Sequence, residues 1–168
     1  GWAPTPVPGR PLDLYVVHLN FTDRSGATRT RQIADLMAFV ADTHGGGPFI
    51  VGGDFNTDAA SAELAPLRRG LVDAYAQAHA DADAGAEHVT LNPVFNPPAR
   101  IDAIYVRKGA FGSPQARRIL DRPTSDGRWA SDHFGVWVRL PGPAAARGDQ
   151  PASTDAAEAG RPSPAGTM

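Results

Sequence analysis

Acidic, amide and histidine side chains stand beside four hydrophobic segments of this sequence, where a plain strand would not place them. They are His18 in VVHLN, Asp54 and Asn56 in GGDFN, Asp102 in RIDAIYV, and Asp132 and His133 in SDHFGV. Polar residues at strand ends on one rim of a sheet converge in space, and α/β proteins place their sites there. We therefore expect these six side chains to form one functional site.

Taken singly, most of these residues have a structural explanation. A lone histidine such as His18 is usually a satisfied core residue, GGDFN can be a turn, and SDH can precede a strand without a further role. Asp102 is harder to explain in this way, because strand alternation places it on the same face as Ile104 and Val106. A half-buried carboxylate needs a partner, and we predict that His133 is that partner.

The hydrophobic patterns predict the elements that position these residues. Continuous apolar runs predict buried strands, and apolar residues at helical spacing predict an amphipathic helix. The predicted strands cover residues 12–19, 48–56, 100–106 and 134–140, and the predicted helices cover residues 29–43 and 61–69. The strand–helix–strand order over 12–56 predicts a right-handed crossover between neighbouring parallel strands.

Composition divides the chain into three parts. The 168 residues, 42% of them hydrophobic, suit one globular domain, which we place at residues 12–140. Residues 1–11 are proline-rich and are predicted to be a linker or a truncation scar. Residues 141–168 are rich in Pro, Ala and Gly and are predicted to be disordered.

Charge and cysteine content exclude several classes of function. The net charge of −2 gives no global attraction to nucleic acid, although a metal site can bind phosphate under a neutral surface. The absence of cysteine excludes disulfides, thiol catalysis and Cys-ligated zinc. No apolar run approaches the ~20 residues that a membrane span needs.

The ordered set HLN, GGDFN, RIDAIYV and SDHFGV resembles the C-terminal motifs of the endonuclease/exonuclease/phosphatase superfamily. Arg31-Gln32 and LVDAY (71–75) are further similarities, and the resemblance covers residues 12–140. It implies an α/β fold, namely the C-terminal part of the four-layer sandwich of the deoxyribonuclease I-like type. It also implies a hydrolase that uses Mg²⁺ or Mn²⁺ to cleave a phosphate ester, either a nuclease or a related phosphodiesterase, with a monomeric parent protein.

The resemblance also implies catalytic roles for individual residues. His133 becomes the general base, Asp102 fixes its tautomer, and Asp54 holds the attacking water near the metal. Asn56 binds a phosphate oxygen, and His18 contacts the phosphate or the leaving oxygen.

Three further roles concern the metal and the substrate. The resemblance implies metal ligands from Asp54, Asn56 and Asp132, with the alternative that Asp132 only orients a ligand; carboxylate and amide oxygens suit hard cations. Thr90 and Asn96 are candidates for contact with the substrate, and packing within their loop is the equally weighted alternative.

One departure from the superfamily affects the expected activity. The first half of the superfamily fold supplies an Asn and a metal-binding Glu, and neither precedes Leu12 here. We therefore expect the N-terminal half to be absent, Mg²⁺ to bind weakly, and this chain alone to be a poor enzyme.

Alternatives from other classes remain open at this stage. A sphingomyelinase-like lipid phosphodiesterase shares the same motifs, and an inactive fragment could act as a binding scaffold. A serine hydrolase is disfavoured, because HGGG (44–47) occurs without a G-x-S-x-G elbow.

Overall fold

The computed structural model describes residues 2–5, 12–82 and 85–142. The linker predicted for residues 1–11 and the tail predicted for residues 141–168 therefore fall mostly outside the described residues. No helix in the described part is long and apolar enough to span a membrane.

The principal sheet has five strands in the order β1-β2-β3-β5-β4. These strands are β1 (Trp2–Thr5), β2 (Leu12–His18), β3 (Phe49–Asp54), β4 (Leu71–Asp73) and β5 (Asp102–Arg107). β2 and β3 are parallel, as the predicted crossover requires, whereas β5 is antiparallel to β3. A second, two-stranded sheet consists of β6 (Gln115–Ile119) and β7 (Gly135–Arg139).

Helix α1 (Ala27–Thr43) connects β2 to β3 and buries one face against the sheet. Ile33 and Val40 are buried on this face, and Leu36 and Met37 pack against the same core. This is the stripe that the helical spacing predicts, although the helix begins two residues earlier than expected. The remaining helices are short: η1 (Ala62–Leu64), α2 (Ala65–Gly70), α3 (Ala74–Ala78) and η2 (Ala86–His88).

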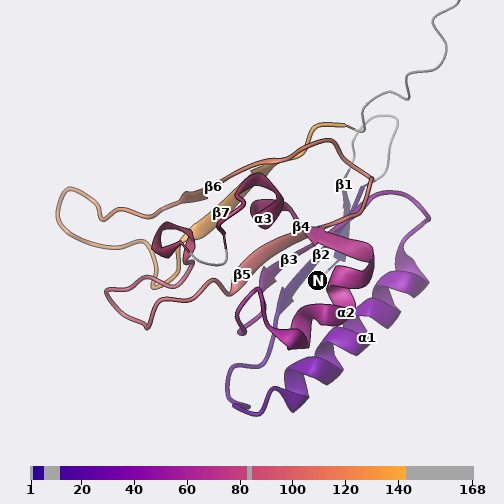
Figure 1. Ribbon diagram of the computed structural model, residues 1–168, viewed down its shortest axis with the longest axis horizontal. Coiled ribbons are helices and arrows are strands. Elements are labelled where there is room, and N and C mark those ends of the chain that lie inside the picture. Colours follow the sequence, from indigo (N-terminus) through magenta and orange to yellow (C-terminus); the bar gives the residue numbers. More distant parts are fainter. Residues whose placement is uncertain (1, 6–11, 83–84, 143–168) are drawn as a thin grey trace, which may run out of the picture.

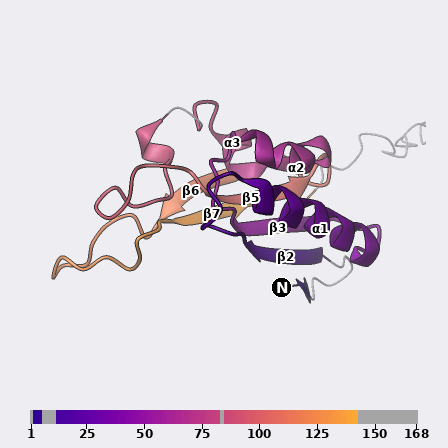
Figure 2. The ribbon, with the colours of Figure 1, turned by 90° about the horizontal axis from the view of Figure 1, so that it is seen from below.

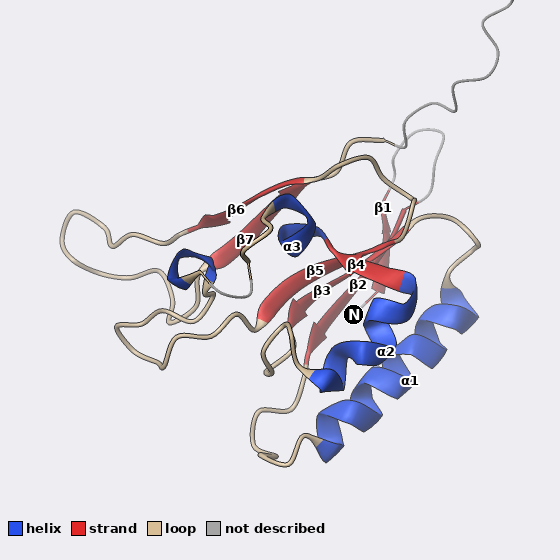
Figure 3. Cartoon of the chain, in the orientation of Figure 1, coloured by secondary structure: helices blue, strands red, loops and turns tan. Residues whose placement is uncertain are grey.

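The molecule is layered. In Figure 1, α1 and α2 lie on one side of the five-stranded sheet, and the β6–β7 pair lies on the opposite side. Figure 2 gives the same elements from below, and Figure 3 separates helices from strands by colour. The core between helices and sheet contains large, fully buried side chains such as Tyr15, Phe55 and Tyr105. Helices α1 and α2 therefore cover one face of the sheet, whereas α3 lies beside the β6–β7 pair.

The opposite face of the sheet is only partly covered. An open groove of about 390 Å³ lies there, lined mostly by apolar residues of β2, β3, β5 and β7, with Asp102 at its wall. Val16, which lines it, is 52% exposed. Burying such a surface is favourable, so an open apolar face of this kind indicates room for another layer.

Three strands were not expected from the sequence. The segment predicted as a linker contains β1, which pairs antiparallel with β2 and includes Pro4. An edge strand tolerates proline, because one row of its backbone groups needs no ladder partner. β4 has only three residues, and β6 has the sequence QARRI, whose charged residues give no apolar run.

Candidate active site

Three of the predicted site residues are neighbours where the ends of inner strands meet at one rim of the sheet. This rim is called the site edge. β2 and β3 end at this edge, and the antiparallel strand β5 begins there. The pairing register aligns His18 with Asp54, and Asp54 with Asp102. The mixed strand directions therefore place residues from the ends of two strands and the start of a third in one row.

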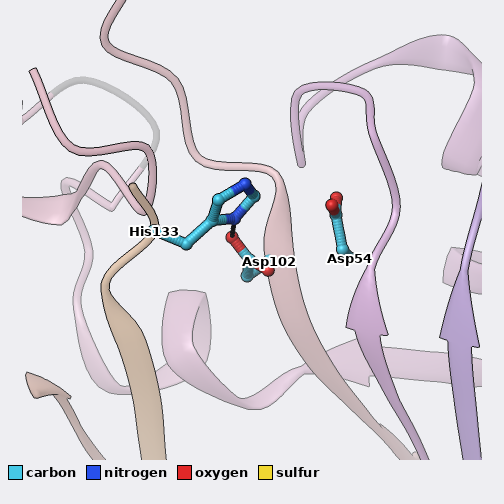
Figure 4. Close-up of side chains that lie close together, drawn as sticks. All are labelled: Asp54, Asp102 and His133. Atoms are coloured by element: carbon cyan, nitrogen blue, oxygen red, sulfur yellow. Dashed lines mark hydrogen bonds and ion pairs between the residues drawn. The ribbon is translucent and has the colours of Figure 1, made fainter. Parts of the chain in front are cut away.

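His133 completes this row from the segment before β7. Its Nδ1 lies 2.9 Å from Asp102 Oδ2, and Figure 4 shows the imidazole directed at this carboxylate with Asp54 close by. The two side chains are 29% and 21% exposed. The predicted pairing of Asp102 with His133 is therefore present in the structure.

The charges around His133 favour its protonated form. Burial of the ring opposes protonation, but the hydrogen bond to Asp102 and the charges of Asp102, Asp54 and Asp132 outweigh burial and raise the pKa of His133. An imidazole with a raised pKa is a stronger proton acceptor than a free one.

Asp54 is fixed by the residue two positions after it. Its Oδ1 accepts a hydrogen bond from the Asn56 backbone N–H at 2.8 Å, and its Oδ2 lies 3.2 Å from Asn56 Nδ2. His18 Nε2 is 3.5 Å from the same Oδ2. Burial raises the pKa of Asp54, the Asn56 N–H lowers it, and the neighbouring Asp102 raises it further.

Two backbone conformations in GGDFN shape this corner. Gly53 has φ +140°, and a Cβ there would lie 2.0 Å from the Val17 carbonyl oxygen. Only glycine allows β2 to approach β3 this closely. Asn56 has φ +50°, a left-handed conformation that asparagine tolerates, and its Nδ2 donates to the Leu19 carbonyl at 2.9 Å.

The family model for the Endonuclease/Exonuclease/phosphatase family matches residues 1–133. The chain belongs to this family. The family membership expected from the sequence motifs is thereby confirmed. No curated protein sequence significantly matches the chain.

Solved structures share the fold at low sequence identity. D. rerio TDP2 in complex with single-strand DNA product is 23% identical, with a TM-score of 0.66 over 82% of this chain and 59% of that chain. C. elegans TDP2 is 18% identical, with a TM-score of 0.68 over 83% of this chain and 45% of that chain.

The catalytic domain of human Nocturnin with bound sulfate is 25% identical, with a TM-score of 0.57 over 79% of this chain and 48% of that chain. This chain thus spans at most about 59% of these three structures, and its α/β fold corresponds to part of a family domain.

The site residues fit a divalent cation of the kind that members of this family typically use. One ligand atom each from Asp54, Asp102 and His133 lie within 4.8 Å of one another. Two partly buried carboxylates so close together repel each other, and a cation between them would relieve that repulsion. Because Asp102 already accepts from His133, Asp54 is the better candidate for a metal ligand.

Asp132 lies beside this group but not within it. Its side chain is exposed, and its Oδ1 accepts a hydrogen bond from the Ser131 hydroxyl at 3.3 Å. Its metal-binding role stays a prediction. Asn56 has its amide nitrogen engaged with Asp54 and Leu19, which leaves its carbonyl oxygen as the atom able to bind a cation.

Thr90 was a candidate for substrate contact, with loop packing as the alternative, and in the structure it packs within its loop. The residue is 2% exposed, and its hydroxyl accepts hydrogen bonds from the backbone amides of Ile101 and Asp102. Its side chain is therefore enclosed by the protein. Asn96 is partly exposed, and its Nδ2 lies 3.5 Å from the Asp132 carbonyl, so it is within reach of the site edge.

Sequence reasoning missed Arg29, which holds the loops next to the site. Its guanidinium contacts both carboxylate oxygens of Glu63, at 2.7 and 3.0 Å. It also donates to the carbonyls of Asn20 and Asp23. The sequence singled out Arg31 instead, which is exposed. The three-residue spacing from Arg29 to the half-buried Gln32 was the signal that could have found it.

A second group of possible ligands lies away from this edge, formed by Asp81, Glu87 and His88. His88 is buried, with Nδ1 3.0 Å from the Tyr75 hydroxyl and Nε2 3.2 Å from Asp81 Oδ1. Both carboxylates are 66% exposed. These hydrogen bonds satisfy the ring without a metal.

Proposed function

We propose that this chain carries catalytic residues of a divalent-metal-dependent phosphodiesterase. The enzyme would hydrolyse phosphodiester bonds of nucleic acid by attack of water on phosphorus. The observation that carries the proposal is the hydrogen bond between His133 and Asp102 directly beside the carboxylate of Asp54. A base, its orienting acid and a metal-binding carboxylate are the groups that phosphodiester hydrolysis needs.

In the proposed reaction, Asp102 accepts a hydrogen bond from the Nδ1–H of His133, which fixes the tautomer of the ring. The other ring nitrogen, Nε2, is then free to take a proton from water. The water oxygen forms a bond to phosphorus while the bond from phosphorus to the leaving oxygen breaks. His18, which is 71% exposed at this edge, is placed to donate a hydrogen bond to the phosphate or to the leaving oxygen.

A divalent cation bound by Asp54, with Asn56 and Asp132 nearby, would stabilise negative charge on the phosphate oxygens. Asp54 is prepared for this role, because the Asn56 hydrogen bonds fix its carboxylate and burial strengthens its need for a counter-charge. Mg²⁺ or Mn²⁺ suits these oxygen donors.

Nucleic acid is the substrate class that the comparisons favour. The D. rerio TDP2 structure with the same fold is a complex with a single-strand DNA product. A lipid phosphodiester is the competing substrate, and it would use the same catalytic residues.

We also propose that full activity needs further layers of the four-layer family sandwich. This chain spans about 59% of the D. rerio TDP2 structure, and an apolar groove lies open on the sheet face opposite α1. The isolated chain is therefore expected to hydrolyse slowly and to bind Mg²⁺ weakly, and a longer chain containing the remaining layers is expected to be faster.

The experiment compares hydrolysis of a single-stranded oligonucleotide and of sphingomyelin, each with Mg²⁺ or with EDTA. His133→Ala is expected to lower kcat by about 10²- to 10⁴-fold, the usual contribution of a general base. His44→Ala is the matched control, because His44 follows α1 at the opposite end of β3. Oligonucleotide cleavage that survives in His133→Ala would refute the proposal, and cleavage of sphingomyelin alone would replace nucleic acid by lipid.

A further inference from the structure

Residues 90–92 form a short bridge between the two halves of the catalytic pair. On one side, Thr90 and Leu91 donate backbone hydrogen bonds to the Ala99 carbonyl, just before β5. On the other side, Leu91 pairs with His133 as an isolated antiparallel bridge. The backbone before β5 and the backbone that carries His133 are therefore linked through the 90–92 segment.

Thr90 makes the contacts that reach both partners. Its Oγ1 accepts from the Asp102 backbone N–H at 3.0 Å and from the Ile101 N–H at 3.0 Å. Its carbonyl oxygen accepts from the Phe134 N–H at 2.6 Å, one residue after His133. A single buried residue is thus bonded to the backbone of the acid and to the backbone next to the base.

From this geometry we infer that Thr90 is a positioning residue that sets the hydrogen bond between Asp102 and His133. The catalytic importance of Thr90 rests on the proposed function, whereas its effect on the hydrogen bond between Asp102 and His133 is a property of the folded chain. The hydroxyl fixes the start of β5, from which the Asp102 side chain projects. The carbonyl fixes the segment that carries His133.

A substitution at position 90 can remove the side-chain hydroxyl of Thr90, whereas the backbone carbonyl remains. Thr90→Val keeps the shape of the side chain and leaves the amides of Ile101 and Asp102 without their acceptor. The hydrogen bond from Ile101 is buried, since Ile101 is 8% exposed and Thr90 is 2% exposed, and the hydrogen bond from Asp102 is partly buried. Unpaired buried amides are unfavourable, so the start of β5 is expected to move away from residue 90 to regain partners. The Asp102 carboxylate then moves with it.

Thr90→Ser is the matched control, since it keeps the hydroxyl and loses only a methyl group. We expect Thr90→Val to lower kcat by about 10- to 100-fold with little change in KM, as small displacements of a catalytic group do. Thr90→Ser is expected to stay close to wild type. If Thr90 only supported the fold, Thr90→Val would lower the melting temperature but would not lower kcat selectively while KM stays constant.

The decisive measurement needs no activity. The Nδ1 proton of His133, held against Asp102, is observed by proton NMR of the 168-residue chain and assigned by its loss in His133→Ala. Wild type and Thr90→Ser are expected to share one chemical shift for this proton, and Thr90→Val is expected to shift or lose the signal. An unchanged signal in folded Thr90→Val would overturn the inference.

Two further outcomes are also decisive. If Thr90→Val does not fold, Thr90→Ala replaces it, because the smaller side chain leaves room for a water to reach the amides. An Ala signal identical to that of wild type overturns the inference, and a displaced signal supports it. If no variant, including wild type, hydrolyses a phosphodiester, the proposed function fails, while the NMR comparison still decides the role of Thr90.

Discussion

Replacing Glu63 by Gln tests how strongly the loops beside the site are fixed. The Arg29 side chain is 8% exposed and that of Glu63 is 22% exposed, with two hydrogen bonds between them. Glu63→Gln keeps the length of the side chain but removes its charge. It also turns one acceptor into an amide donor that faces the donors of Arg29.

The expected loss of stability follows from the burial of this pair. Removing one partner of a fully buried ion pair costs about 3–5 kcal/mol. Arg29 keeps two carbonyl acceptors, at Asn20 and Asp23, and Glu63 is partly solvated. We therefore expect a loss of about 2–3 kcal/mol in the free energy of unfolding, which corresponds to a fall in Tm of roughly 4–12 °C for a domain of this size.

Urea denaturation followed by circular dichroism measures this change. The control is Asp126→Asn, which breaks an ion pair of 2.6 Å with Arg128 whose side chains are 84% and 52% exposed. Exposed pairs contribute only about 0–1 kcal/mol. If Glu63→Gln shifts the urea midpoint no more than Asp126→Asn does, burial does not strengthen the Arg29 pair and the reasoning is refuted.

Two further predictions concern His133 and the open sheet face. Because the folded-state pKa of His133 is raised, its contribution to stability is present below its unfolded pKa of about 6.5 and is lost as pH rises through the folded value. In Asp102→Asn, the free energy of unfolding measured by urea titration should fall less steeply as the pH rises from about 6.5 through the folded pKa of His133. An equally steep fall in wild type and Asp102→Asn would contradict this prediction. The open groove beside Val16 should bind the apolar dye ANS in the native state, and Val16→Glu should weaken that binding while the urea midpoint stays constant. Native protein that leaves ANS fluorescence unchanged would show that this face is covered.

The sequence predicts the central elements and the site because both depend on simple local patterns. Apolar runs located β2, β3, β5 and β7 to within two residues at each end, and helical spacing identified the buried face of α1. Strand alternation alone places Asp102 on the same face as Ile104 and Val106, so its need for a partner is evident before the fold is known. The structure supplies that partner in His133.

The remaining features depend on tertiary context. The sequence leaves substrate contact and loop packing open for Thr90, and only the folded backbone shows that its hydroxyl accepts from the amide of Asp102 and is buried. Arg29 and Arg31 look equivalent in the sequence, but the turn of the helix buries one and exposes the other. The strand β6 carries no apolar pattern, because it lies in a two-stranded sheet whose residues are mostly exposed or half-buried.

The order of strands in the sheet also has a kinetic consequence. β3 pairs with β5, although α2, β4, α3 and the 90–92 segment lie between them in the sequence. Pairings between residues so distant in sequence are slow, because the loop must close before the contacts repay its entropy. No local hairpin can bring Asp54 and Asp102 together. We therefore expect the site to assemble late in folding, so that a partially folded chain lacks the arrangement of these side chains that could bind a cation or a phosphate.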